Sequence, residues 1–266
     1  VAKNSSANVV GGVLNRVLPD GSQSVINAFR RNEMIEDFRT DIQSAMRHST
    51  NFSCCNKIFS RRMLQQIPAY FQEGLYMQDI EFWLHLLNSG ISLKQTDLIV
   101  SNYNQIPGSG SRVQSTARFE SVFRLYDLLR LHYSDRNGLP REVADTAFMQ
   151  GAVHFFLRWK LTDLDNQNLR FQAKRDLEKL HKVLKDIPLE SYRQLYNKKN
   201  NKGPIDFASF LARTGDFDAA ATLLKTTSPR DFRAFSKANP DADISAIEDY
   251  ARGIVEKSCE RVGMSK

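Results

Sequence analysis

Apolar residues in the first part of the chain follow two different spacings. Residues 8–18, 51–59 and 91–103 contain apolar runs typical of strands, and Pro19–Ser22 follows the first run as a turn. A helix is predicted over 78–89, where apolar residues recur at positions i, i+3, i+4 and i+7: Ile80, Trp83, Leu84 and Leu87. Strand, helix and strand in this order predict part of an α/β layer.

Shorter elements are predicted between these segments. Ser60 is a suitable N-cap for a helix over 61–67, which Pro68 would end. Residues 24–31 and 37–48 are predicted to be helical or irregular. The loop 106–111 is rich in glycine and serine, and it follows the last predicted strand.

From Ser115 onward the pattern predicts helices only. An aromatic and apolar stripe runs through 119–133, and further helices are expected over 141–161, 168–185, 189–197, 205–213, 216–225 and 243–259. The fold class expected is therefore α/β followed by an all-α C-terminal region. The two parts are residues 1–114 and 115–266.

Composition restricts the function classes. The chain has 266 residues, 41% of them hydrophobic and 25% charged, which excludes a disordered chain. Its net charge of +7, from 37 basic and 30 acidic residues, is spread thinly rather than gathered in a nucleic-acid-binding arm. We therefore expect no nucleic-acid partner, whereas a mild preference for phosphates or an inner membrane surface stays open.

Cysteine, histidine and hydropathy patterns point to a cytoplasmic protein without a metal site of its own. Cys54, Cys55 and Cys259 match neither a disulfide framework nor a zinc motif, and the five histidines are scattered. No uncharged apolar run approaches the ~18–20 residues that a membrane span needs. No secretory signal opens the sequence.

Four short motifs follow one another closely: Asn56-Lys-Ile-Phe-Ser-Arg61, Glu73-Gly74, Gln78-Asp-Ile-Glu-Phe-Trp83 and Pro107-Gly-Ser-Gly-Ser-Arg112. Over residues 8–130 the chain resembles the acceptor-side half of family 2 glycosyltransferases with the GT-A fold. Many members have Asn-Lys-hydrophobic-Phe-x-Arg, a Glu-Gly loop, Glu-Asp-x-x-Phe-Trp and Tyr-Tyr-Arg-x-Arg-Pro-Gly-Ser-x-Ser. The order of the motifs is more specific than any one of them.

The resemblance implies transfer of a sugar from a nucleotide-sugar donor to a glycan or lipid-linked acceptor in cell-envelope polysaccharide synthesis. Asp79 matches the family's general base, which takes the proton of the acceptor hydroxyl in an inverting transfer. The unpaired N–H groups at a helix start favour the carboxylate form of this residue. The alternative is that Asp79 only caps the helix.

Further positions matching the family's substrate site are Asn56, Lys57, Glu73, Gly74, Gln78, Trp83, Ser109, Ser111 and Arg112. Trp83 could present its ring to a sugar or belong to the core. Asn56 and Lys57 have structural roles as an equal alternative, and Gly74 could serve a close backbone approach or merely a turn.

The chain also departs from the family pattern. Gln78 replaces a glutamate, and Asn104 and Ile106 occupy two arginine positions that would help hold diphosphate, a role that the 108–112 loop could partly take over. The family's donor half and Asp-x-Asp metal motif precede the part seen here, so we expect the natural chain to begin upstream of Val1. Asp163–Asp165 and Asp216–Asp218 lie in the helical region and do not replace that motif.

Two hypotheses follow from the sequence. In the first, the chain is a truncated, by itself inactive part of a glycosyltransferase whose divalent cation (Mn or Mg) has its ligands outside this chain. Its helical extension docks a partner, a lipid-linked acceptor or a membrane surface. Docking on a membrane surface would place the protein at the inner face of the membrane as a peripheral protein. In the second, the chain is a non-catalytic helical interaction module with a degenerate transferase remnant. The departures at Gln78, Asn104 and Ile106 motivate this second hypothesis.

Overall fold

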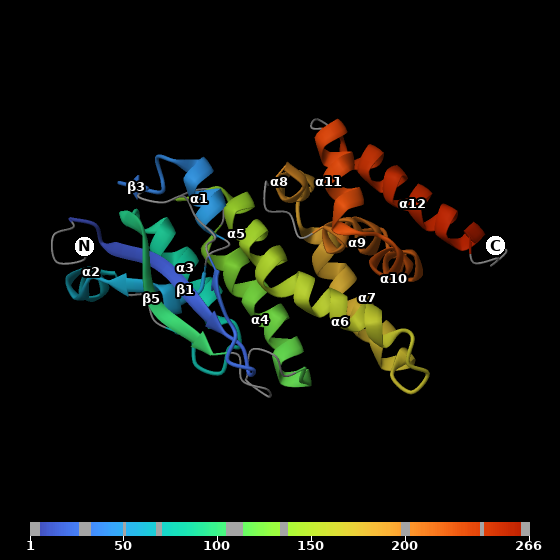
Figure 1. Cartoon of the computed structure of the whole chain (residues 1–266), viewed down its shortest axis with the longest axis horizontal. Coiled ribbons are helices and arrows are strands. Elements are labelled where there is room, and N and C mark those ends of the chain that lie inside the picture. The colour runs from blue at the N-terminus through green and yellow to red at the C-terminus, as the bar shows by residue number, and fades with distance from the viewer. Residues whose placement is uncertain are drawn as a thin grey trace. The chain divides into compact units, whose positions relative to one another are not determined.

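The computed structural model describes residues 6–26, 33–49, 52–67, 71–104, 114–133, 138–197, 203–239 and 242–261. The chain divides into two compact units, Val1–Ala147 and Phe148–Lys266 (Figure 1). The first unit contains a mixed sheet with helices, and the second is helical. This confirms the α/β class followed by a largely helical C-terminal region.

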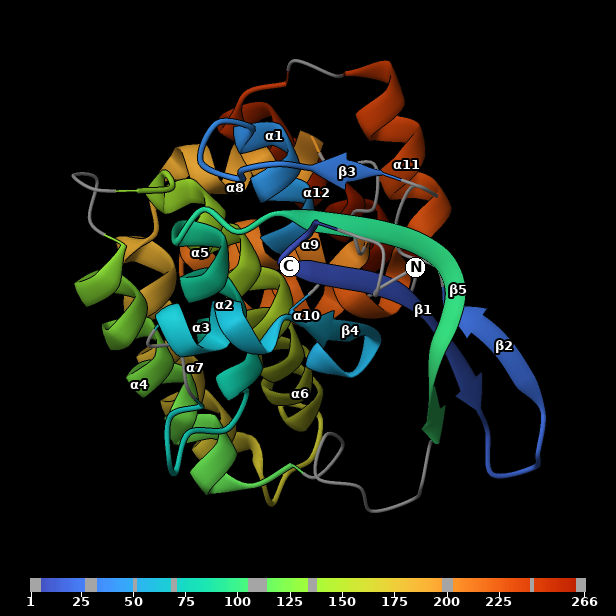
Figure 2. The same ribbon diagram turned by 90° about the vertical axis from the view of Figure 1, so that its left-hand side faces the viewer.

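The sheet of the first unit is built around two long parallel strands. Its described strands are β1 (Val9–Val17), β2 (Gln23–Ile26), β3 (Met34–Ile35), β4 (Lys57–Phe59) and β5 (Leu93–Asn104). β1 pairs with β5 in parallel, whereas β2 and β4 pair with β1 and β3 pairs with β5 in antiparallel orientation. Figure 2 shows β2 and the C-terminal ends of β1 and β5 extending away from the helices of the first unit.

The helices of the first unit lie beside this sheet (Figures 1 and 2). They are α1 (Ile42–Ser49), α2 (Arg61–Gln66), α3 (Gln78–Asn88), α4 (Thr116–His132) and α5 (Arg141–Phe148), and a 3-10 turn, η2, spans Cys54–Asn56. The central helix is α3, which contacts both α1 and α4. Its buried face contains Ile80, Trp83, Leu84 and Leu87, which confirms the predicted helical stripe.

Two predictions about the first unit were wrong in detail. The segment 24–31 was expected to be helical or irregular, but its described part belongs to strand β2, because Gly21 (φ 81°) closes a turn that brings it onto β1. Only Lys57–Phe59 of the expected 51–59 strand pairs with β1, and the preceding residues form η2. The short strand β3 had no counterpart among the predicted elements.

The second unit consists of helices joined by short connections. After a π-helical turn at Met149–Val153, its helices are α6 (His154–Asp163), α7 (Arg170–Asp186), α8 (Leu189–Asn197), α9 (Pro204–Arg213), α10 (Phe217–Thr226), α11 (Pro229–Ala238) and α12 (Ile244–Arg261). The core includes the fully buried rings of Tyr192, Phe207, Phe210 and Phe232. Helix α11 was not predicted, although Ser228 and Asp231 form a capping box at its start.

The compact units divide later than the change of pattern at residue 115. Helix α4 contacts α3 and therefore belongs to the first unit, and the division falls within α5. The assignment of residues 1–114 to a glycosyltransferase domain and of 115–266 to an extension stays a prediction.

Candidate functional site

Asp79 lies in the first turn of α3, two residues after a strained backbone position. Met77 has φ 62°, and it is the one non-glycine residue with positive φ among those that the structure describes. A left-handed conformation costs a residue with a side chain roughly 1–2 kcal/mol. The N–H of Ile80 donates to the Met77 carbonyl (3.0 Å), which closes the turn around Asp79. Such conformations concentrate at functional sites.

Lys57 places a buried ammonium group near this helix start. Its side chain extends from the first residue of β4, and the residue is only 8% exposed. The ammonium donates to the carbonyl oxygen of Ser53 and to Oδ1 of Asn56 (3.0 Å), and it lies 4.5 Å from the centre of the Trp83 ring. Burial lowers the pKa of Lys57 to about 7, although the charge of Asp79 acts in the opposite direction.

The half-buried carboxyl of Asp79 has a raised pKa. Burial is the largest cause, and it outweighs the backbone amides of Asp79 and Ile80 and the charges of Lys57 and Arg118, which all lower the pKa. The backbone amides at the helix start therefore stabilise the carboxylate of Asp79, as expected, but burial destabilises the carboxylate by more. A raised pKa brings a carboxyl closer to neutral pH, which suits a general base.

Arg118 belongs to the same cluster and was missed by the sequence analysis. It lies in the first turn of α4, is 8% exposed, and interacts electrostatically with Asp79. Burial lowers the pKa of Arg118, and the charge of Asp79 raises it. No local motif marks this residue, since only the packing of α4 on α3 brings it to Asp79.

Trp83 is part of the core. Its side chain has no exposed surface, its indole N–H donates to the His48 carbonyl (2.8 Å), and its ring meets Phe38 edge to face. Lys57 covers the ring, so no face is open to a sugar. Of the two roles expected for Trp83, burial therefore favours the core.

Asn56 is buried as well. Its amide donates to the Gly12 carbonyl (3.4 Å), and its Oδ1 accepts from Lys57. These contacts join the 3-10 turn to β1 and fix the lysine. They favour the structural alternative for Asn56.

The remaining predicted site residues are more open or lie outside the described residues. Gln78 is half-buried beside Asp79, and Glu73 and Gly74 lie in an exposed loop. Gly74 has φ 69°, a conformation that favours glycine, and its carbonyl accepts from Arg124 (3.0 Å). Ser109, Ser111 and Arg112 fall outside the described residues.

The described residues do not fit a metal at Asp79. Lys57 and Arg118, its electrostatic partners, are cations and would repel a divalent ion. Within the described ranges, no group of three or more His, Cys, Asp or Glu residues is arranged to hold a metal. The described residues therefore provide no ligand set for the expected divalent cation.

The acidic pairs of the helical unit have structural partners. Asp216 caps α10 through the N–H of Ala219 and forms an ion pair with Arg252, and Asp218 lies near Arg170. Asp165 pairs with Lys225. None of these contacts resembles a metal-binding arrangement.

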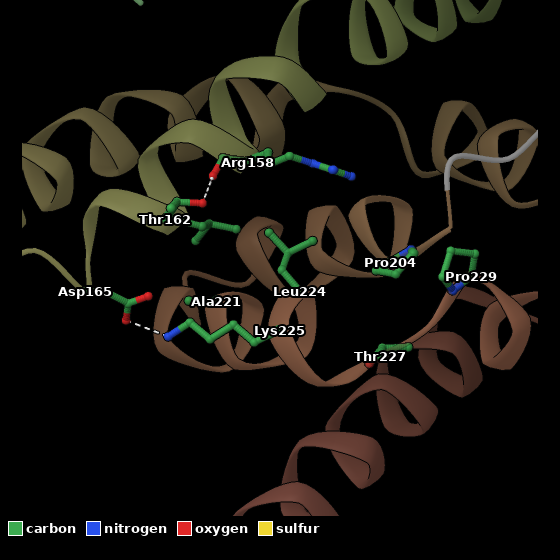
Figure 3. Close-up of a pocket in the computed structure, with 10 residues that line it drawn as sticks. Arg158, Thr162, Asp165, Pro204, Ala221, Leu224, Lys225, Thr227 and Pro229 are labelled. Atoms are coloured by element: carbon green, nitrogen blue, oxygen red, sulfur yellow. Dashed lines mark hydrogen bonds and ion pairs between the residues drawn. The ribbon is translucent and has the colours of Figure 1, made fainter.

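A separate pocket lies within the helical unit (Figure 3). Its volume is about 580 Å³, within the range of small-molecule pockets. It is lined by Arg158, Leu161, Thr162, Asp165, Pro204, Ala221, Leu224, Lys225, Thr227 and Pro229. The ion pair between Asp165 and Lys225 closes one end, the Arg158 side chain extends along one wall, and Leu224 contributes apolar surface.

Comparison with known proteins leaves the family open. No protein-family model matches the chain, and no curated protein sequence matches it significantly. Among the helices that the structure describes, none combines the length and apolar character needed to cross a membrane.

Proposed function

We propose that this chain is the acceptor-side part of a nucleotide-sugar-dependent glycosyltransferase in which Asp79 is the general base. The acceptor would be a glycan or a lipid-linked glycan of a cell-envelope polysaccharide. The observation that carries the proposal is the position of Asp79, a half-buried carboxyl at the start of α3, two residues after the strained Met77 and in electrostatic interaction with two buried cations.

The chemistry fits this arrangement. In an inverting transfer the acceptor oxygen attacks the anomeric carbon while its proton passes to the base. Burial raises the pKa of Asp79, which increases its affinity for the proton, and Lys57 and Arg118 stabilise its ionised form before the transfer. The nucleotide-sugar donor and a divalent cation would be held by residues other than those described. The isolated chain is therefore expected not to transfer sugar.

Cytoplasmic residence, with peripheral contact to the inner face of the membrane, belongs to the same proposal. The net charge of +7 favours contact with an anionic surface over contact with a neutral one.

Substitution of Asp79 in the complete protein tests the role of the base. Asp79→Asn keeps the shape of the side chain and removes the proton acceptor, so transfer should fall by about 10²-fold or more, the usual contribution of a general base. Nucleotide binding should be unchanged. Asp97→Asn, at an exposed position of β5, is the matched control and should keep full activity. Unchanged transfer in Asp79→Asn would remove this residue from the mechanism.

The pocket of the helical unit favours a second candidate function, a non-catalytic interaction module. Its apolar wall and the Arg158 side chain could receive an apolar residue and an acidic group of a partner (Figure 3). In that case Leu224→Arg should abolish the biological function, and Asp79→Asn should leave it intact. The glycosyltransferase proposal instead requires Asp79→Asn to lower transfer by about 10²-fold or more.

A further inference from the structure

The buried ammonium of Lys57 connects three parts of the first unit. It donates hydrogen bonds to the carbonyl oxygen of Ser53 and to Oδ1 of Asn56, on the segment before β4, and its third neighbour is the ring of Trp83 on α3. Trp83 is itself fixed by its hydrogen bond to the His48 carbonyl on α1. The ammonium is therefore held from several sides at the ring of Trp83. Asp79 lies four residues before Trp83 on α3, and residues at this spacing lie on the same face of a helix. The Lys57 ammonium is therefore on the face of α3 that carries Asp79, which agrees with the electrostatic interaction between the two groups.

We propose that Lys57 is a positioning residue for Asp79: its ammonium, fixed by Ser53, Asn56 and the Trp83 ring, keeps the Asp79 carboxyl in its ionised, proton-accepting form. The catalytic meaning of this role rests on the proposed function. The coupling between the two charges does not, and it can be measured without any substrate.

The charged form of Lys57 exists in the pH range where Asp79 needs it. Burial lowers the pKa of Lys57 to about 7, so the ammonium persists at acidic pH, where the raised pKa of Asp79 would otherwise favour the neutral acid. Above neutral pH the lysine loses its charge. In that range the high pH itself favours the ionised form of the Asp79 carboxyl, so a nearby cation matters less. Each group thus opposes the effect of burial on the other.

The other titratable neighbours of Lys57 do not replace this coupling. Burial raises the pKa of Cys54 to about 11 and lowers that of His48 to about 4, so both are uncharged at neutral pH. Cys55 raises the pKa of Lys57, as Asp79 does, and Arg118 acts on Asp79 with the same sign as Lys57. Lys57 and Arg118 are thus the two cations acting on Asp79 among the described residues.

Trp83 provides a direct readout of Lys57, because a cation over an indole ring changes its fluorescence. The chain contains two tryptophans, so Trp159→Phe leaves Trp83 as the single reporter. Fluorescence of this variant should show a titration step near pH 7. Adding Lys57→Met should remove the step, and adding Lys94→Met, at a half-buried lysine of β5, should keep it.

The decisive variant is Asp79→Asn in the same background. Loss of the carboxylate should move the Lys57 step down by about half a pH unit or more, because a nearby opposite charge favours the ammonium. An unmoved step, no step in the starting variant, or a step that survives Lys57→Met would each overturn the proposal. Since Asp79→Asn leaves Lys57 in place, the test holds even where Lys57→Met does not fold.

The pH dependence of transfer by the complete protein then tests the role in catalysis. Lys57→Met removes a cation that favours the Asp79 carboxylate, so the pH below which transfer declines should increase by about one unit. Lys57→Arg keeps a permanent positive charge, so transfer should decline at the same acidic pH as in the original protein. If Lys57→Met leaves this pH unchanged, the positioning role is refuted. Transfer that is insensitive to Asp79→Asn would instead refute the proposed function, while the fluorescence coupling would still stand.

Discussion

Acidification should destabilise the first unit through His48. This side chain on α1 has no exposed surface, and its Nε2 lies 3.2 Å from Oε2 of Glu33. Burial lowers the pKa of His48 from 6.5 to about 4 in spite of this carboxylate. Between these two pH values the unfolded chain binds a proton that the folded chain does not bind, so the free energy of unfolding falls as the pH is lowered.

The magnitude follows from the shift. A difference of about 2.5 pKa units, at about 1.4 kcal/mol per unit, gives a loss of about 3 kcal/mol between pH 6.5 and pH 4. His48→Gln does not titrate, and its amide can still donate to Glu33. The free energy of unfolding of the original protein minus that of His48→Gln should therefore decrease by about 3 kcal/mol as the pH is lowered from 6.5 to 4.

Urea unfolding, followed by Trp83 fluorescence in the Trp159→Phe background, measures this difference in the first unit. Trp83 is a suitable probe because it is fully buried and bonded to the His48 carbonyl. His85→Gln, at a half-buried histidine of α3, is the matched control. A difference between the protein and His48→Gln that stays constant from pH 7 to pH 4 would refute the reasoning.

Two further predictions concern stability. Lys160 forms a 2.7 Å ion pair with Asp176 inside the helical unit, both side chains being less than 10% exposed. Lys160→Met should therefore lower the free energy of urea unfolding by about 3 kcal/mol, and the double variant with Asp176→Leu should recover most of it; equal stability of the two variants would contradict this. Gly253→Ala, where the added methyl group meets open space in α12, should raise stability by about 1 kcal/mol. Gly90→Ala, at φ 72° after α3 and with the added methyl group in close contact with Nε of Arg39, should lower it by at least a similar amount, and a thermal melt in which both substitutions have the same sign would contradict this reasoning.

Elements with strong local signals could be predicted from the sequence. Helix α3 and most helices of the second unit carry clear 3.6-residue periodicity, and their positions agree with the expectations within a few residues. Strand β2 could not be recognised, because Gln23–Ile26 lacks a distinctive run and forms a strand only by pairing with β1. The start of α11 has a local sequence signal, the capping box of Ser228 and Asp231, so this helix is predictable from its sequence.

The site was predictable only in its local part. Lys57 and Asp79 stood out because they lie in short motifs, whereas Arg118 and His48 reach the cluster through the packing of α4 and α1. The sequence left the role of Trp83 open, since periodicity does not tell which face of an aromatic ring is covered. Burial beneath Lys57 is a tertiary property, and it favours the core.

Local rules of stable folding are broken repeatedly at the start of α3. Met77 adopts a left-handed conformation, Lys57 is a buried cation, and burial raises the pKa values of both Asp79 and Glu81. Each feature costs stability by itself, and an apolar or glycine residue would remove the cost. In the helical unit, by contrast, the buried cation Lys160 is directly paired with a carboxylate. Because strain and buried charge collect where a protein needs reactive groups, their concentration around Asp79 favours a working site there over a degenerate remnant.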